Sequence, residues 1–328
     1  MKIYLATEMG GSPFTDSHSL DILKKCNCCI TENISEADVV VAHNYKNLLL
    51  SILRHPKKKF LVWTNEPRFD TTFKSEIKLP LGFPEIHIMN VYGGEVFWHN
   101  LHFLSSYHFD NTNDLGMDIN KPLEHLTREQ LKSSGKKNKI AALFTNTISL
   151  KNSLIKDGTN IDLSTKRCQY AIAGHKRSLL HIYGNKWPNG YALDNSGYGF
   201  EKQRPWWIEK LEILKGYKFN LCFENTAQQY YITEKIWHAI LSYNLPIYNS
   251  LNSSIYESFP KDSFIDANLF KDDDALFNFI EAMTEDEYLE RLNLCIDVFN
   301  SSLKTKRDNY EMNANEVINK IVARLINR

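Results

Sequence analysis

The sequence contains no run of about 20 apolar residues, which is the length that a membrane-spanning helix requires. Its first residues, MKIYLATEMGG, turn polar too early to supply the apolar core of about 7–15 residues of a signal peptide, and they predict a first β-strand instead. An excess of charge is also lacking, because 39 basic residues balance 39 acidic ones. Balanced charge does not favour nucleic acid as a partner. We therefore expect a globular, cytoplasmic protein with no nucleic-acid partner.

Paired metal-ligating side chains are lacking as well. The six cysteines are Cys26, Cys28, Cys29, Cys168, Cys222 and Cys295. The first three are crowded into one segment and the others stand alone in apolar runs, so no two ligand pairs have the spacing of a structural zinc site. Free thiols in a reducing compartment are the better interpretation.

Short apolar runs alternate with helical or polar segments along the 328 residues. The runs predict strands at residues 3–6, 38–42, 60–63, 85–91, 140–144, 180–183, 219–223 and 245–248. Helical patterns cover residues 19–25, 48–54, 166–175, 206–214 and 233–243, and the chain is helical from residue 272 onward. We assign the aromatic pair in helix 206–214 to the core. Strands separated by helices predict parallel sheets that are covered on both faces.

One segment, residues 123–139, is polar, has no hydrophobic period and is the best linker in the chain. A chain of this length usually forms two domains. We expect an N-terminal domain over residues 1–138 and a C-terminal domain with terminal helices over residues 139–328. The predicted fold class is α/β, with two domains of similar size that face each other across a cleft. Neither half contains a G-x-G-x-x-G turn or a Walker loop, so neither is a typical dinucleotide or ATP domain.

The most informative segment is residues 219–248, FNLCFENTAQQYYITEKIWHAILSYNLPIY, which predicts a β-α-β unit. Ligands of such sheets lie at the carboxyl ends of strands, next to helix N-termini. Glu234 and Lys235 fall in the first turn of the predicted helix, where a lysine opposes the helix dipole unless an anion binds there. Two interpretations follow from the residues alone. Either this turn binds a phosphate group, or both side chains point to solvent.

The same segment resembles a known family. FENTAQQYYITEKIW is similar to the donor-binding signature of the α-1,3/1,4-fucosyltransferases, and the YKF before it and the PIYNS…FPKDSFIDANLF after it continue the similarity over residues 217–270. The resemblance implies the GT-B fold, two Rossmann-like domains with the GDP-fucose donor held by the C-terminal one. It places Lys235 at the diphosphate and Glu234 against the fucose ring. It also puts Asn225 and Tyr231 in the donor site, while Glu224 braces the loop.

A second cation is implied earlier in the C-terminal domain. The family has an arginine at the head of a helix that leads into a strand with a D-x-y/f-G ending, and Arg167 has the matching spacing before residues 181–184, HIYG. His181 stands where the family has an acid. Arg177 is close enough in sequence to be a rival, and Arg167 can also be read as a surface helix charge.

The N-terminal domain holds the proposed base. Residues 62–67, VWTNEP, resemble a shortened form of the family's W-x-N-x-E-S-P acceptor motif, which makes Glu66 the counterpart of its catalytic glutamate. The simpler interpretation is a Glu-Pro turn after a strand. As base, Glu66 would take the proton of the acceptor hydroxyl while GDP leaves from the opposite face, a single displacement with inversion.

The reaction that the resemblance implies requires no divalent metal. Arg167, Lys235 and a helix N-terminus can together supply the positive charge that the leaving diphosphate needs, so we expect no metal site and no cofactor. The one dense acidic run, residues 272–274, is interpreted as the N-terminus of a helix rather than as a metal-binding motif.

The C-terminal tail carries an apolar stripe, which comprises Ile318, Ile321, Val322 and Leu325, and a basic face beside it. This helix either packs across the domains or lies on the cytoplasmic face of a membrane, where lipid-linked acceptors occur. The function implied is an inverting fucosyltransferase of glycan biosynthesis that acts on an oligosaccharide or glycolipid, α-1,3 to GlcNAc or Glc. The alternatives are a GT-B transferase with another nucleotide-sugar donor, and a non-catalytic protein that binds glycans or nucleotides.

Overall fold

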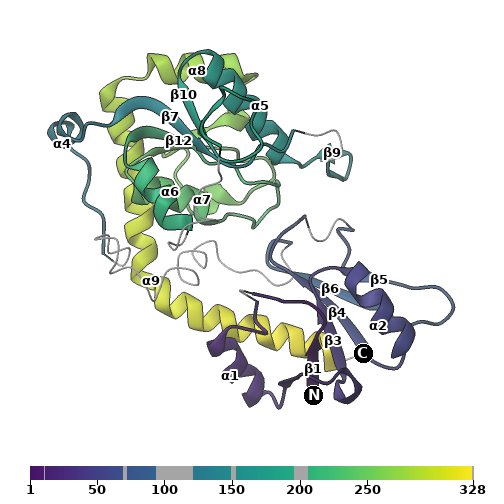
Figure 1. Ribbon diagram of the computed structural model, residues 1–328. Helices are drawn as coiled ribbons and strands as arrows, with labels where there is room; N and C mark the ends of the chain where they lie inside the picture. The colour runs from purple at the N-terminus through teal and green to yellow at the C-terminus, as the bar shows by residue number, and fades with distance from the viewer. Residues whose placement is uncertain (11, 69–71, 94–120, 149–152, 196–205, 327–328) are drawn as a thin grey trace. The chain divides into compact units, whose positions relative to one another are not determined.

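The computed structural model describes residues 1–10, 12–68, 72–93, 121–148, 153–195 and 206–326 (Figure 1). The chain forms two compact units, each described here by itself. Unit 1 comprises the described parts of Met1–His102, Gln228–Tyr230 and Lys306–Arg328. Unit 2 comprises those of Phe103–Ala227 and Tyr231–Thr305.

Unit 1 is built on a six-stranded sheet. Its order is β2 (Cys29–Thr31), β1 (Lys2–Leu5), β3 (Val39–Ala42), β4 (Lys59–Thr64), β6 (Ile86–Asn90) and β5 (Glu76–Ile77). All neighbours are parallel except the edge strand β5, which is antiparallel to β6. The sequences VVVA in β3 and FLVWT in β4 are buried throughout, as expected of strands that are covered on both faces.

Helices cover both faces of this sheet. The side chains Val40, Val62 and Ile88 pack in one cluster with Ile52 of α2 (Leu49–Arg54). Figure 1 shows α1 (Ser17–Lys25) and the C-terminal turns of α9 (Glu285–Ile326) on the side opposite to α2. Two short 3-10 turns, Ile34–Glu36 and Tyr45–Leu48, complete the connections.

Unit 2 is built on a second six-stranded sheet, whose strands are all parallel. Its order is β11 (Ala192–Asp194), β10 (Leu180–Tyr183), β7 (Lys137–Leu143), β12 (Tyr217–Leu221), β13 (Leu245–Tyr248) and β14 (Ile265–Asp266). The helices are α4 (Arg128–Ser133), α5 (Leu163–Lys176), α6 (Trp206–Leu214), α7 (Glu234–Leu241), α8 (Asp273–Ala282) and the first part of α9. A hairpin of β8 (Ile155–Lys156) and β9 (Thr159–Asn160) precedes α5, and 3-10 turns lie at Ile255–Glu257 and Ala267–Leu269.

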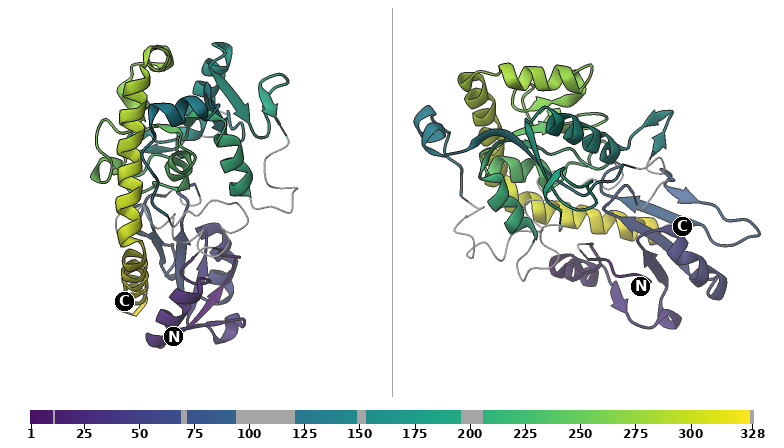
Figure 2. Two further views of the ribbon diagram at one scale, coloured as in Figure 1. Left: turned by 90° about the vertical axis from the view of Figure 1, so that its left-hand side faces the viewer. Right: turned by 45° about the horizontal axis from the view of Figure 1, so that its top comes forward.

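The two units, each built on a mainly parallel sheet with helices, confirm the predicted α/β class with two Rossmann-like halves. The alternating strands and helices of unit 2 are visible in both views of Figure 2. That the two sheets face each other across a cleft stays a prediction.

The segment interpreted as a linker is ordered and belongs to unit 2. Residues 123–139 contain α4, which starts at a capping box between Thr127 and Gln130, and the beginning of β7. The amide group of Asn293 in α9 bonds both main-chain groups of Leu126, at 2.8 and 3.2 Å. These long-range bonds join the segment to α9, so the units divide before it, whereas the predicted boundary follows residue 138.

A half-buried lysine, Lys136, anchors the same segment. The Lys136 ammonium donates to the carbonyl oxygens of Lys215, Tyr217 and Ser242 at 2.8–3.0 Å. Burial lowers the pKa of Lys136 to about 8. This amine satisfies carbonyl groups at the ends of α6, β12 and α7. The polar residues around Lys136 in the sequence gave no indication of this structural role.

The C-terminal residues form one helix of 42 residues, α9. Its last turns belong to unit 1, where Ile318, Ile321 and Leu325 are completely buried. The guanidinium of Arg324 donates to the Ser75 carbonyl at 3.1 Å. The apolar stripe is therefore part of a protein core. The residues that suggested a membrane contact are largely buried, so this expectation has no support. Among the helices of the described residues, none is both long and apolar enough to cross a membrane.

All six cysteines are unpaired, as expected. Cys26 and Cys28 lie near the C-terminal end of α1, and Cys222 and Cys295 are buried in unit 2. Burial raises the pKa of the Cys222 thiol well above its ordinary value. The buried thiols thus act as small apolar side chains.

Gly184, which follows β10, occupies a position that no side chain can share. Its φ is +125°, and a Cβ atom there would lie 2.5 Å from the carbonyl oxygen of Phe144. We expect Gly184→Ala to destabilise unit 2 by about 2–3 kcal/mol, because backbone strain adds to a clash with main-chain atoms that cannot move aside. Chemical denaturation measures this change as a lower midpoint at an unchanged slope.

The matched control is Gly190→Ala. Gly190 also has a positive φ, +85°, but a Cβ there would meet nothing within 4 Å. We expect this variant to lose about 1 kcal/mol from backbone strain alone. Equal losses in the two variants would contradict the close approach of Gly184 to Phe144.

Candidate functional site

A cavity of about 230 Å³ lies in unit 2 at the carboxyl ends of β7 and β12, beside the N-terminus of α7. Its walls are formed by Leu143, Phe144, Thr145, Arg167, Trp206, Lys210, Asn220, Cys222, Phe223, Glu234 and Lys235. Three of the predicted site residues, Arg167, Glu234 and Lys235, thus come together from α5 and α7. This is the position at which parallel α/β sheets bind their ligands.

A larger cavity, about 730 Å³, lies in unit 1 but at the amino ends of β1, β3 and β4. It contains none of the predicted site residues. The Lys58 ammonium on its wall donates to the Ser35 carbonyl at 3.1 Å, and Lys59 bonds the Leu325 carbonyl, so these lysines have structural roles. We assign the candidate site to the smaller cavity for its position and its residues, not its size.

Glu224 fixes the start of α7, as the resemblance implied. Its carboxylate is buried and accepts hydrogen bonds from the Thr233 amide at 2.7 Å and from the Thr233 hydroxyl at 2.8 and 2.9 Å. Burial raises the pKa of Glu224, although the nearby Lys235 opposes this rise. Since Thr233 is the N-cap of α7, the carboxylate sets where this helix begins.

Lys235 does not point to solvent. Its side chain is 20% exposed, and its ammonium lies 3.0 Å from Glu224 Oε2 and 3.4 Å from Glu234 Oε1. It also donates to the Thr233 hydroxyl at 2.7 Å. The solvent-facing interpretation of this turn is therefore wrong. Two carboxylates compensate the charge of Lys235, which explains how a lysine is tolerated in the first turn of a helix.

Glu234 is held as an anion. Burial acts to raise its pKa, but the positive charges of Lys235 and Lys210 and the nearby His238 outweigh burial and bring the pKa well below its ordinary value. The carboxylate therefore stays ionised through the physiological range of pH, and it places a permanent negative charge on the cavity wall.

Arg167 is the arginine of the cavity. Its guanidinium stacks over Phe144 with 4.7 Å to the ring centroid, and its Nη1 lies 3.5 Å from the Phe223 carbonyl oxygen. It is carried by α5, whose N-cap Asp162 accepts from the amides of Ser164 and Thr165. The planar group is thus positioned between the ends of β7 and β12, the two central strands.

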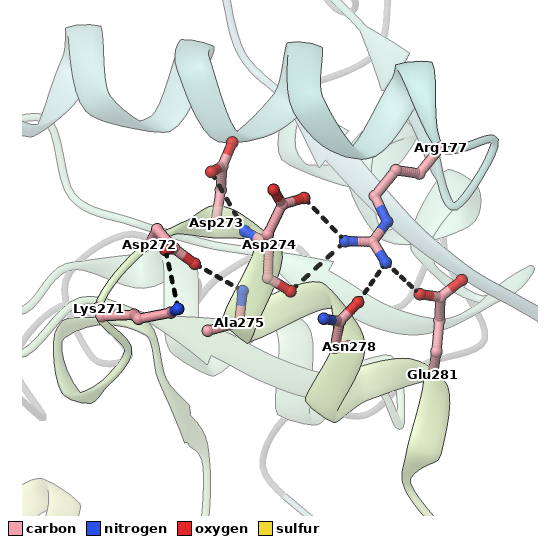
Figure 3. A network of polar contacts seen from close by, with 8 residues as sticks. All are labelled: Arg177, Lys271, Asp272, Asp273, Asp274, Ala275, Asn278 and Glu281. Carbon is pink, nitrogen blue, oxygen red and sulfur yellow. Dashed lines mark hydrogen bonds and ion pairs between the residues drawn. The ribbon is translucent and has the colours of Figure 1, made fainter.

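The rival Arg177 has another role, shown in Figure 3. It lies past the C-terminal end of α5 and binds three residues of α8: Asp274 at 3.1 Å, Glu281 at 2.7 Å, and Asn278. It is absent from the cavity wall. Arg177 therefore joins α5 to α8, and Arg167 is the one of the two arginines that lines the cavity.

The acidic run is the N-terminus of α8, as predicted. Figure 3 shows Asp272 accepting from the Ala275 amide, at 2.8 Å, as the N-cap. Asp273 and Asp274 occupy the first turn, where negative charge is favourable.

Asn225 and Tyr231 belong to the loop between β12 and α7 but do not line the cavity. The Asn225 carbonyl accepts from the amides of Leu163 and Ser164 at 3.0 and 3.1 Å, which ties the loop to the start of α5. Tyr231 is buried, with 2% of its surface exposed. Direct contact of either residue with the donor stays a prediction.

Glu66 lies in unit 1, directly after the carboxyl end of β4. Its amide donates to the Thr64 hydroxyl at 3.0 Å, and this hydroxyl donates to the Glu66 carbonyl at 2.8 Å. The turn after β4 thus exists, with the carboxylate half-buried. Its role as a base stays a prediction.

Sequence reasoning missed two cavity residues on α6, Lys210 and Trp206. Trp206 was assigned to the core, but it lies on the cavity wall with its ring 6.1 Å from that of His238. Lys210 occupies one position of an otherwise apolar stripe with Trp207, Leu211 and Leu214, and it is 5% exposed. A lysine at a buried position of an amphipathic helix was the signal that could have found it.

Among the described residues, one group of side chains has the chemistry and spacing of a cation site: Glu76, Glu85 and His87 at the β5–β6 edge of unit 1. Glu76 lies 3.4 Å from Lys78, and Glu85 lies 3.8 Å from His87.

The comparisons with known proteins point to the same unit. The sequence pattern of glycosyltransferase family 10 (fucosyltransferase) C-term matches residues 160–293, which include α5, α6 and α7. An alpha-(1,3)-fucosyltransferase of Helicobacter pylori is 40% identical over 85 residues, which are 25% of this chain and 18% of that protein. A human 4-galactosyl-N-acetylglucosaminide 3-alpha-L-fucosyltransferase is 36% identical over 78 residues, 23% of this chain and 22% of that protein. The matches thus span about a fifth of the length of these curated relatives.

A solved alpha1,3-fucosyltransferase with GDP-fucose aligns over 93% of this chain and 89% of its own, with a TM-score of 0.46 and 20% identity. The family pattern covers the segment that carries Arg167, Lys210, Glu234 and Lys235. Residues 160–293 of this chain therefore match the C-terminal domain of glycosyltransferase family 10 (fucosyltransferase).

Proposed function

We propose that this chain is an inverting fucosyltransferase that transfers L-fucose from GDP-fucose to a hydroxyl group of a glycan. The observation that carries the proposal is the cavity of the family 10 domain, where Arg167, Glu234 and Lys235 meet at the N-terminus of α7. Two cations and a helix N-terminus favour the diphosphate of the donor. The ionised Glu234 is the partner for positive charge that develops on the sugar ring.

In the proposed reaction, the acceptor oxygen attacks the anomeric carbon of fucose and its proton passes to Glu66. The bond from that carbon to the diphosphate breaks, and GDP leaves with the electron pair. Arg167, Lys235 and the α7 N-terminus stabilise the charge on the departing phosphate, so the reaction needs no divalent metal. Asn225 and Tyr231 orient the donor through the loop that they belong to.

The acceptor is proposed to be an oligosaccharide or glycolipid that receives fucose at O3 of GlcNAc or Glc. The names of the relatives support this choice, because the bacterial one is an alpha-(1,3)-fucosyltransferase and the human one acts on 4-galactosyl-N-acetylglucosaminide. A cytoplasmic location belongs to the same proposal.

The donor is tested by thermal unfolding with GDP, GDP-fucose, GDP-mannose, UDP-glucose and UDP-GlcNAc, each in EDTA. A ligand at about 100 times its Kd stabilises the folded state by about 2.7 kcal/mol, which moves the midpoint by several degrees. We expect GDP and GDP-fucose to stabilise the protein. A response to uridine nucleotides alone would indicate another donor, and no response to any nucleotide would favour a binding protein for glycans. A requirement for added Mg²⁺ or Mn²⁺ would contradict the metal-free mechanism.

The two arginines of α5 make a matched pair of variants. We expect Arg167→Met to weaken GDP binding by about ten- to a hundredfold, because a charged hydrogen-bond partner at the cavity is lost. Arg177→Met should bind GDP like the parent protein and lose about 1 kcal/mol of stability through its contacts with α8. Titration calorimetry with GDP measures the first effect. Loss of binding in Arg177→Met, with Arg167→Met unaffected, would reverse the assignment.

A further inference from the structure

The buried amine of Lys210 has no function in the mechanism above. Lys210 lines the cavity from α6 and is 5% exposed. Within the part of the chain that the structure describes, its ammonium has no hydrogen bond and no ion pair. A buried lysine of this kind is unfavourable unless something compensates its charge, and here burial lowers the pKa to about 8.

The other charges of the cavity show what this compensation can be. Lys235 already contacts two carboxylates, Glu224 at 3.0 Å and Glu234 at 3.4 Å. Its positive charge is largely matched by the protein itself. Lys210 is a further cation on the cavity wall beside Arg167, and the nearby Glu234 opposes the effect of its burial without cancelling it, so an anion that enters the cavity finds positive charge there.

We propose that Lys210 is a further donor-binding residue, whose ammonium neutralises the diphosphate of the bound nucleotide together with Arg167. This inference rests on the proposed function, because it assumes that a guanosine diphosphate group occupies the cavity. This role in donor binding explains why a lysine interrupts the apolar stripe of α6. It also means that both α6 and α7 contribute to donor binding.

The first test compares GDP affinity at pH 7 in three variants by titration calorimetry. Lys210→Met should weaken binding by about ten- to a hundredfold, and Lys210→Arg should keep most of the affinity because the charge remains. Lys215→Met is the matched control, since this lysine is exposed just beyond the end of the same helix. It should bind GDP like the parent protein. Unchanged affinity in Lys210→Met would overturn the proposal.

The second test uses pH and needs no variant that loses the positive charge. With a pKa of about 8, the protonated fraction of Lys210 falls from about nine-tenths at pH 7 to about one-tenth at pH 9. Because only the protonated form neutralises the diphosphate, GDP affinity of the parent protein should fall about tenfold over this range. Lys210→Arg does not titrate there and should show no such fall.

Other groups around this amine are the same in both proteins, so the comparison removes their contributions. They are Glu234, Lys235 and His238 of α7, Cys222 and Glu224 after β12, and Arg167 of α5. Identical pH profiles for the parent and Lys210→Arg would overturn the proposal and leave the fucosyltransferase function intact. A parent protein that binds no GDP at any pH would overturn the proposed function and this inference together.

Discussion

Replacing Lys235 with methionine should destabilise the protein by about 3 kcal/mol, because it leaves Glu224 buried without its cationic partner. Glu224 is 1% exposed and lies 3.0 Å from the Lys235 ammonium, in a position fixed by two groups of Thr233. The remaining carboxylate must take up a proton or stay charged in an apolar environment. The free energy of unfolding, from chemical denaturation, measures this loss.

The loss should depend on pH. Burial already raises the pKa of Glu224 in the folded state, and removing Lys235 raises it further. A raised folded pKa contributes stability at low pH, and this contribution is lost as pH rises through the folded pKa. Lys235→Met should therefore be less destabilised at pH 5 than at pH 8.

The control is a double variant. Glu224→Gln in the Lys235→Met background removes the unpaired charge and keeps an acceptor for the Thr233 amide. We expect it to recover about half of the loss, with a coupling energy of about 1 kcal/mol or more. A loss below about 0.5 kcal/mol at both pH values would contradict the pairing of Lys235 with Glu224.

Glu66→Gln should reduce kcat by about 10²–10⁴-fold, the usual contribution of a positioned base. Glutamine keeps the shape of the side chain and the main-chain bonds between Glu66 and Thr64, so the turn after β4 should stay intact. GDP affinity should be unchanged, because the donor cavity is formed by residues of unit 2. The measurement is fucose transfer from GDP-fucose to N-acetyllactosamine, with GDP binding by calorimetry as the second readout.

Glu32→Gln is the matched control for this variant. Glu32 is exposed and follows β2, the edge strand of the same sheet. It should have normal kcat and normal GDP affinity. Full turnover in Glu66→Gln would remove Glu66 from the mechanism, while lost GDP binding would assign it to the donor instead.

The strands and helices were predictable wherever a local pattern defined them. Helix 206–214 has the predicted limits, and β10 and β13 agree with their predicted ranges, because apolar periodicity depends only on neighbouring residues. The two-residue strands β5 and β14 were missed. Such short strands exist through pairing with distant strands, which no local pattern records.

Domain boundaries, like short strands, depend on contacts between distant residues, and segment 123–139 is an example. Its polar sequence predicted a linker, but Asn293 and Asn300 of α9 bond the main chain at Leu126 and Leu123 and join the segment to unit 2. The C-terminal tail was also ambiguous. Its apolar stripe fits a membrane surface or a protein core equally well in sequence, and the packing of Ile318 and Ile321 in unit 1 decided between them.

For the site, the sequence by itself determined that Glu234 and Lys235 belong together, since the motif places them in one helical turn at the end of a strand, whereas it left Arg167 and Arg177 as rivals. The tertiary structure alone decided that Arg177 binds α8, that Lys235 is paired with Glu224, and that Lys210 enters the cavity. The physical reason is that burial and charge compensation depend on groups from separate elements. Residue type and spacing within one element show which charged side chains are present. Only the packing of α5, α6 and α7 around the sheet decides which of these charges are paired.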